Sequence, residues 1–155
     1  MRRMKKKCLR KSDGFTLIEL VLVIAILGVL AVTALPNLFD FSLTNARTNS
    51  RDAVVGAVQA GLSLYAANQI AAGNAESYPA FLETTGLAAG TAASRTVPLF
   101  NAVLQNGVTS QWFKVHDTCY AYDSNGNGTL DAATVDLRYQ YTGGTTGTFL
   151  GISSC

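Results

Sequence analysis

The sequence predicts an α+β fold in which one long N-terminal helix packs its second half against a small antiparallel sheet. An apolar run over residues 15–35 is typical of a membrane-spanning helix. Small and apolar residues then recur at three- and four-residue spacing over 46–65, which predicts an amphipathic helix. After residue 110 the chain is rich in β-branched and aromatic residues, which favour strands.

The charge is divided unevenly along the chain. The sequence has 12 Lys and Arg against 10 Asp and Glu, a formal net charge of +2. Seven of the basic residues lie in residues 1–14, where Asp13 is the one acid, so the remainder of the chain is mildly acidic. A basic segment before an apolar helix is a membrane-topology signal. We therefore predict no nucleic-acid partner for the folded body.

The apolar run from Phe15 to Leu35 contains one charged residue, Glu19. A helix of this length rises about 30 Å, enough to cross the hydrocarbon core of a membrane. The basic residues before it predict a cytoplasmic N-terminus and an exported body. A cleaved signal peptide would have a shorter apolar core, of about 7–15 residues. Composition alone leaves a plain, unprocessed signal anchor open.

Glu19 makes the class of anchor specific. A carboxylate inside a spanning helix is costly and usually has a partner or a function, and Glu19 has no evident partner in its own sequence neighbourhood. The sequence G-F-T-L-I-E, from Gly14 to Glu19, resembles the processing signature of type IV pilins and type II secretion pseudopilins. The resemblance continues to Pro36 and covers roughly residues 8–66.

This resemblance implies a processed, self-assembling protein. A prepilin peptidase would cut after Gly14, removing the cytoplasmic leader 1–14, and would methylate the new amino group of Phe15. Glu19 would pair with the N-terminal cation of a neighbouring copy, because two opposite charges in a low-dielectric surround neutralise each other. The implied partners are other copies of the chain, the peptidase, and the inner-membrane assembly machinery.

The resemblance also implies a location and a domain organisation. The chain would first cross the bacterial inner membrane once, with its N-terminus in the cytoplasm, and would then enter an extracytoplasmic filament. Residues 15–36 form the transmembrane and polymerisation helix, and residues 37–155 form a pilin-like head that includes the second half of the helix. Because proline lacks a backbone donor, Pro36 predicts a kink or a locally melted stretch. The helix is expected to end around Asn68–Gly73.

The remainder of the head is predicted as a connecting loop followed by three or four strands. The loop covers residues 73–96, and 97–104 is either a short strand or a short helix. Alternating or β-rich residues predict strands over 111–116, 118–122, 134–141 and 148–152, with a turn at 143–147.

The cysteines divide between the two sides of the membrane. Cys8 lies in the leader, whereas Cys119 and Cys155 lie in the exported part, where two cysteines usually form a disulfide. Free thiols are the alternative. Such a bond would stabilise the head by roughly 3–4 kcal/mol in the chain-entropy model. In pilins a C-terminal disulfide loop of this kind is common.

The segment from Asp123 to Asp131 resembles the first part of an EF-hand calcium loop. Oxygen-bearing groups stand at alternating positions, with glycine at the sixth. The predicted Ca²⁺ ligands are Asp123, Asn125, Asn127, the carbonyl of Thr129, and Asp131. Thr134 stands where the motif has a bidentate glutamate, and Asp136 or Asp117 would have to replace it. A metal-free hairpin loop is the alternative, since Asn-Gly dipeptides form turns by themselves.

No pattern in the sequence indicates catalysis or requires a cofactor. The single histidine, His116, lies beside Asp117, and no nucleophile motif, phosphate loop or metal tetrad accompanies it. We therefore predict a structural subunit of a type IV pilus-like filament, serving adhesion, motility or DNA uptake. A type II secretion pseudopilin for protein export is the alternative, and a membrane-anchored extracellular binding or adhesin module is a further one. Glu19 favours the body of a filament over its tip, because a tip subunit has no neighbour ahead of it, and the chain length together with the pair Cys119 and Cys155 favours a pilus subunit over a pseudopilin.

Overall fold

The structure is a computed structural model that describes residues 15–155, apart from the side chains of residues 34–41. The leader, with Gly14 and Cys8, lies outside the described residues. The chain divides into two compact units, Met1–Leu43 and Thr44–Cys155. Each unit is described by itself below.

One helix, α1, runs from Leu17 to Ala71 and belongs to both units. Its end at Ala71 confirms the end predicted from the sequence. The helix is continuous through Leu35–Asn37, so the locally melted stretch is not present. The side chain of Pro36 is among those outside the description, and the kink stays a prediction. Within the described residues, no helix combines the length and the apolar character needed to cross a membrane.

The second unit contains a five-stranded antiparallel sheet in which neighbours in sequence are neighbours in space. The strands are β1 (Thr91–Ala92), β2 (Trp112–His116), β3 (Cys119–Tyr122), β4 (Leu137–Thr142) and β5 (Thr148–Ile152). The order β1-β2-β3-β4-β5 is a meander, and the α+β class is therefore confirmed. The register of β2 on β3 shifts between Lys114 and His116.

Two strand predictions need correction. The strand expected from Thr134 begins only at Leu137, because the amides of Val135 and Asp136 both bond back to the carbonyl of Ala132 in a turn. The sheet also has a fifth strand, β1, inside the segment predicted as a loop. β1 has only two residues and is held by pairing with Phe113 and Lys114 of β2.

The segment 97–104 is neither a strand nor a helix. Leu99 forms an isolated bridge with Val108, and the amide of Leu104 bonds to the carbonyl of Phe100 in a turn. Phe100 adopts a positive φ of 62°. Both Leu99 and Phe100 are fully buried, so this irregular segment contributes its apolar side chains to the core rather than to the sheet.

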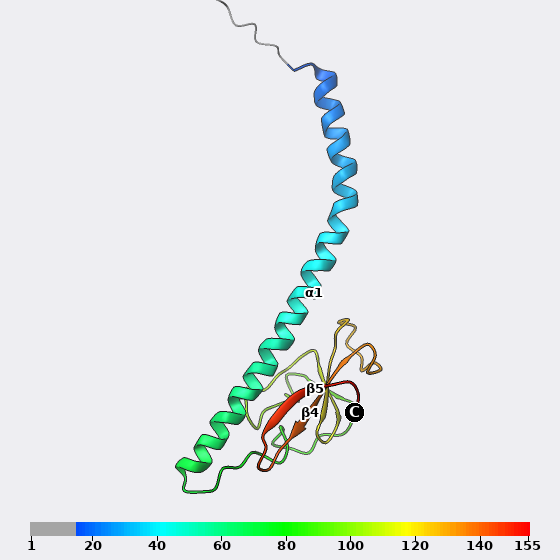
Figure 1. The fold of residues 1–155 in the computed structure, drawn as a ribbon. Coiled ribbons are helices and arrows are strands. Elements are labelled where there is room, and N and C mark those ends of the chain that lie inside the picture. Colours follow the sequence, from blue (N-terminus) through cyan, green and yellow to red (C-terminus); the bar gives the residue numbers. More distant parts are fainter. Residues whose placement is uncertain (1–14) are drawn as a thin grey trace, which may run out of the picture. The chain divides into compact units, whose positions relative to one another are not determined.

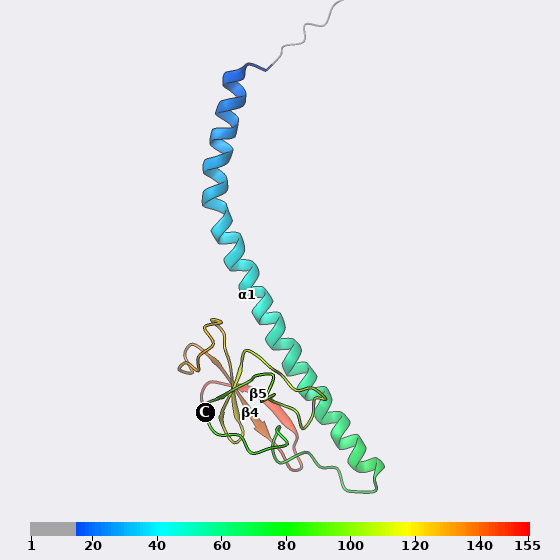
Figure 2. The same ribbon diagram turned by 180° about the vertical axis from the view of Figure 1, so that it is seen from behind.

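The core lies between the sheet and the second half of α1, which runs along one side of the strands in both views (Figures 1 and 2). Val58 and Leu62 of α1 are buried one helical turn apart. They meet an aromatic cluster that comprises Phe100, Trp112, Tyr120, Tyr122, Tyr139, Tyr141 and Phe149. In β3 and β4 these aromatic side chains alternate with residues on the opposite face, as the two-residue period of a strand requires.

Gly61 allows a loop to approach α1 closely. A Cβ at this position would lie 2.5 Å from the carbonyl oxygen of Val103. The small residue therefore lets the 97–104 segment pack directly on the helix.

Candidate functional site

The beginning of α1 places Glu19 in a local hydrogen-bond arrangement. The amide and the hydroxyl of Thr16 donate to Glu19 Oε2 at 2.8 and 2.9 Å, and the amide of Glu19 donates to Thr16 Oγ1 at 3.3 Å. This reciprocal pair is a capping box, which satisfies backbone donors at a helix N-terminus. The expectation that Glu19 has no partner in its own neighbourhood was therefore wrong.

The sequence already carried this signal, since threonine followed three residues later by glutamate before an apolar run is the capping-box pattern. Both short contacts use Oε2. In the described part of the chain, no hydrogen bond or ion pair involves Oε1 of Glu19, and the residue is exposed. Phe15 precedes the helix and is 89% exposed.

Among the residues that the structure describes, nothing in its own unit packs against the first half of α1. Every residue from Phe15 to Thr33 is exposed, including the long apolar side chains. A Cβ at Gly28 would meet nothing within 4 Å. An apolar surface of this extent is typical of a segment that is covered by a membrane or by other molecules.

The head is closed by the predicted disulfide. Cys119 of β3 is fully buried and is bonded to the C-terminal Cys155, with 6.2 Å between the two Cα atoms and a sequence separation of 36. The ring of His116 is next to this bond, with a nitrogen atom within 4.8 Å of both sulfur atoms. The bond fixes the C-terminus to a central strand of the sheet.

The segment from Asp123 to Asp131 is held by its own carboxylates. Asp123, buried at the end of β3, accepts hydrogen bonds from the amides of Gly126 and Gly128. Asp136 is fully buried and accepts from the amides of Ser124 and Asp131. Asp136 therefore ties both ends of the loop together.

The side chains at the alternating positions converge on Asp131. The side-chain amides of Asn125 and Asn127 each donate to Asp131 Oδ2 at 2.8 Å. Both bonds lower the pKa of the Asp131 carboxyl, and the bond from Asn125 has the larger effect. The hydroxyl of Thr129 bonds to Asn127 Oδ1 at 2.8 Å. Four of the predicted ligand residues are thus joined by hydrogen bonds between them, whereas Asp123 is bonded to the backbone amides of Gly126 and Gly128.

These residues match Ca²⁺ in donor type, since calcium prefers carboxylate and carbonyl oxygens. Asp136 lies against the loop as a replacement for Thr134 requires, whereas Asp117 lines a different part of the head. Within the described residues, however, no three carboxylates meet closely enough to share one ion. As arranged, the loop is a self-bonded turn that offers the right atoms for a cation.

Two arginines anchor this loop to the rest of the head. Arg138 of β4 is buried, and its Nη2 donates to the carbonyl of Asp131. The guanidinium of Arg47 in α1 lies directly against Gly126, which has a positive φ of 74°. A side chain at Gly126 would collide with Arg47 and would also be strained in this conformation.

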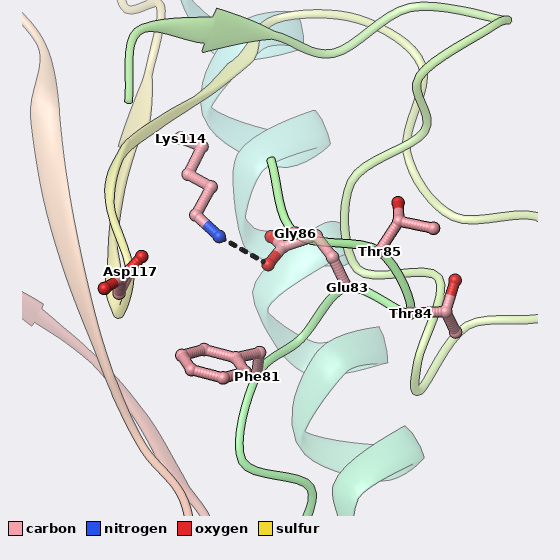
Figure 3. A pocket seen from close by; sticks show the side chains of 7 residues that line it. All are labelled: Phe81, Glu83, Thr84, Thr85, Gly86, Lys114 and Asp117. Atoms are coloured by element: carbon pink, nitrogen blue, oxygen red, sulfur yellow. Dashed lines mark hydrogen bonds and ion pairs between the residues drawn. The ribbon is translucent and has the colours of Figure 1, made fainter. Parts of the chain in front are cut away.

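A second feature, which the sequence did not reveal, is a pocket formed by Phe81, residues 83–86, Lys114 and Asp117 (Figure 3). We call it the Lys114 pocket; its volume is about 190 Å³. Lys114 Nζ pairs with Glu83 Oε2 at 3.1 Å, and both side chains are almost completely buried. The ring of Phe81 lies 5.7 Å from the same Nζ.

The ion pair leaves two buried polar atoms without a hydrogen-bond partner in the described residues, Glu83 Oε1 and the hydroxyl of Tyr120. Burial, followed by the charge of Glu83, raises the pKa of Tyr120. Sequence reasoning missed this pocket because Glu83 and Lys114 lie 31 residues apart and no short motif connects them.

Comparison with known proteins identifies the N-terminal segment. The family model for the prokaryotic N-terminal methylation motif matches residues 9–35. Neither a curated protein nor a solved structure matches the chain. The matched residues include Gly14, Phe15 and Glu19, as the resemblance implied. The chain thus carries the prepilin-type N-terminal signature of type IV pilins and pseudopilins.

Proposed function

We propose that this protein is a structural subunit of a type IV pilus-like filament. The observation that carries the proposal is the methylation motif over residues 9–35, which implies processing by a prepilin peptidase and assembly into a filament. Before assembly the chain would be held in the bacterial inner membrane by residues 15–36. The head would lie on the extracytoplasmic side and would reach the filament surface with it.

The geometry at the start of α1 supports a role for Glu19 in assembly. Cleavage after Gly14 would create an amino group on Phe15, next to Thr16 and two residues before the helix. Glu19 uses Oε2 to cap its own helix, which leaves Oε1 for the amino group of a neighbouring copy. Since both charges are costly in an apolar surround, a neighbour in the wrong register would leave each of them unpaired.

Intact-mass spectrometry of the mature protein tests this proposal. The expected product begins at Phe15 and carries one added methyl group on its amine. A mature chain that begins at Met1 or at Leu35 would show that the segment is a plain anchor or an ordinary signal peptide. The proposed filament function further predicts that the processed chain is recovered in sheared extracellular material.

A type II secretion pseudopilin is the second candidate, because it would carry the same signature. The loop from Asp123 to Asp131 favours it, since some pseudopilins hold calcium in the head. A deletion strain separates the two: loss of surface filaments with normal protein export supports the pilus, and the reverse supports the pseudopilin. A membrane-anchored binding module would affect neither.

Calcium binding at this loop is part of the proposal. Asp123, Asn125, Asn127, Asp131 and the carbonyl of Thr129 would hold the ion, and Asp136, which accepts a hydrogen bond from the backbone amide of Asp131, would assist. When bound, calcium would supply a positive charge that draws these oxygens together. The asparagine side chains would have to present oxygen rather than nitrogen to the centre of the loop.

A further inference from the structure

Two exposed charged side chains in the head have no hydrogen bond or ion pair with any other described residue, Arg95 and Asp117. The other basic side chains of this unit are all engaged or packed: Arg47 against Gly126, Arg51 with Asp52, Lys114 with Glu83, and Arg138 with the carbonyl of Asp131. The other acids are likewise engaged: Asp52, Glu76, Glu83, Asp123, Asp131 and Asp136.

These two charges lie at opposite ends of β2. The chain leaves β1 toward the beginning of β2, where the amide of Ala93 bonds to the carbonyl of Trp112, and Arg95 follows two residues later. Asp117 directly follows His116, at the other end of the strand. At about 3.3 Å per residue, the ends of this strand are roughly 15 Å apart. Arg95 therefore cannot reach Asp117 of its own chain without unfolding this edge of the sheet.

Asp117 belongs to the Lys114 pocket, whose chemistry suits a guanidinium group (Figure 3). Lys114 and Glu83 neutralise each other, so the charge of Asp117 leaves the pocket negative overall. Glu83 Oε1 is an acceptor without a donor in the described residues. Phe81 is 48% exposed, and its ring provides an apolar wall. An arginine side chain carries five N–H donors in a plane and stacks on aromatic rings.

We propose that Arg95 of one copy enters the Lys114 pocket of the next copy in the filament and pairs there with Asp117. The inference rests on the proposed filament function. Arg95 and the Lys114 pocket are at opposite ends of one strand. A copy whose pocket is occupied by one neighbour can therefore still insert its own Arg95 into the pocket of the next. Such a head-to-tail contact propagates into an open polymer if its rotation does not close a ring.

Charge reversal in the full-length chain tests this contact in cells that process and assemble the protein. Arg95→Glu and Asp117→Arg should each lower the amount of sheared filament at least about tenfold, a factor that corresponds to about 1.4 kcal/mol. The double variant should restore assembly, because the pair is re-formed with its charges exchanged. Co-expression of the two single variants should also restore it, since the acid introduced by Arg95→Glu in one chain then meets the base introduced by Asp117→Arg in the other.

Rescue by co-expression shows that the pair forms between copies, which a purely structural role within one head would not produce. Thr145→Glu, on the exposed turn between β4 and β5, controls for added negative charge and should assemble normally. Resistance to limited proteolysis equal to that of the wild type shows that each variant head is folded. Normal assembly of Arg95→Glu, or no rescue in either combination, would overturn the contact. If the wild-type chain is itself missing from the sheared fraction, the filament function fails and the contact fails with it.

Discussion

The two units of this chain differ in where their apolar surface is covered. In the first unit, every described side chain is exposed, from Phe15 to Thr33. In the second unit, Val58, Leu62 and the aromatic cluster of the sheet are buried within the same chain, and a disulfide closes the C-terminus. The comparison indicates that the head completes its own core, whereas the described part of the N-terminal helix leaves its apolar surface uncovered. Each prediction below tests one side of this contrast.

The largest effect on filament assembly is expected for Glu19→Ala. Removing the carboxylate eliminates the charge proposed to pair with the Phe15 amine of a neighbour, so membrane insertion should be normal but the amount of sheared filament should fall at least about tenfold. Thr16→Val is the matched control, because it weakens the capping box and keeps the charge of Glu19. If Thr16→Val assembles as poorly as Glu19→Ala, the role of Glu19 is capping rather than pairing.

The next effect concerns the interior of the head. Lys114→Met leaves the carboxylate of Glu83 buried without its partner, which should destabilise the head by about 3–5 kcal/mol. Replacing both residues, Lys114→Met with Glu83→Leu, should recover most of this loss because no charge is then buried alone. Urea unfolding of the soluble head, residues 37–155, measures both variants. Equal stability of the two variants would show that the ion pair is not what stabilises this site.

A similar but somewhat smaller loss is expected for Cys119→Ser. Removing a bond that joins residues 36 apart should lower the stability of the head by about 3–4 kcal/mol in the chain-entropy model. Thermal unfolding of oxidised wild type, reduced wild type and the variant gives the comparison. Reduced wild type should resemble the variant; a large difference between them would point to damage at the buried position of Cys119 rather than to loss of the bond.

The smallest effect on the stability of the head is expected from the addition of calcium. The structure holds the loop by hydrogen bonds, and the ligand set lacks a bidentate glutamate, so the dissociation constant should be about 10⁻⁴–10⁻³ M. Even with free calcium at about a hundred times the dissociation constant, binding would raise the free energy of unfolding by only about 2.7 kcal/mol. Melting of the head with calcium and with chelator measures the gain. Asp131→Asn should remove it, and an equal response to magnesium would contradict a calcium site.

The features that depend on neighbouring residues in sequence were predictable. The apolar run, the three- and four-residue spacing and the strand patterns gave α1 to within a few residues and four of the five strands. The motif from Gly14 to Glu19 is likewise a pattern of consecutive residues, and the family model matches the segment that contains it, residues 9–35. The capping box of Thr16 and Glu19 is predictable in the same way, because a threonine stands three residues before a glutamate at the start of the apolar run.

Tertiary structure decided the rest. β1 is too short for a periodic signal and exists because β2 offers an edge to pair with. The ion pair of Lys114 and Glu83 joins residues that only the folded sheet brings together. The fold also placed Asp136, rather than Asp117, beside the loop at Asp123. Local sequence determines which way each side chain faces along an element, but a contact between distant segments depends on how the elements pack, which no local pattern records.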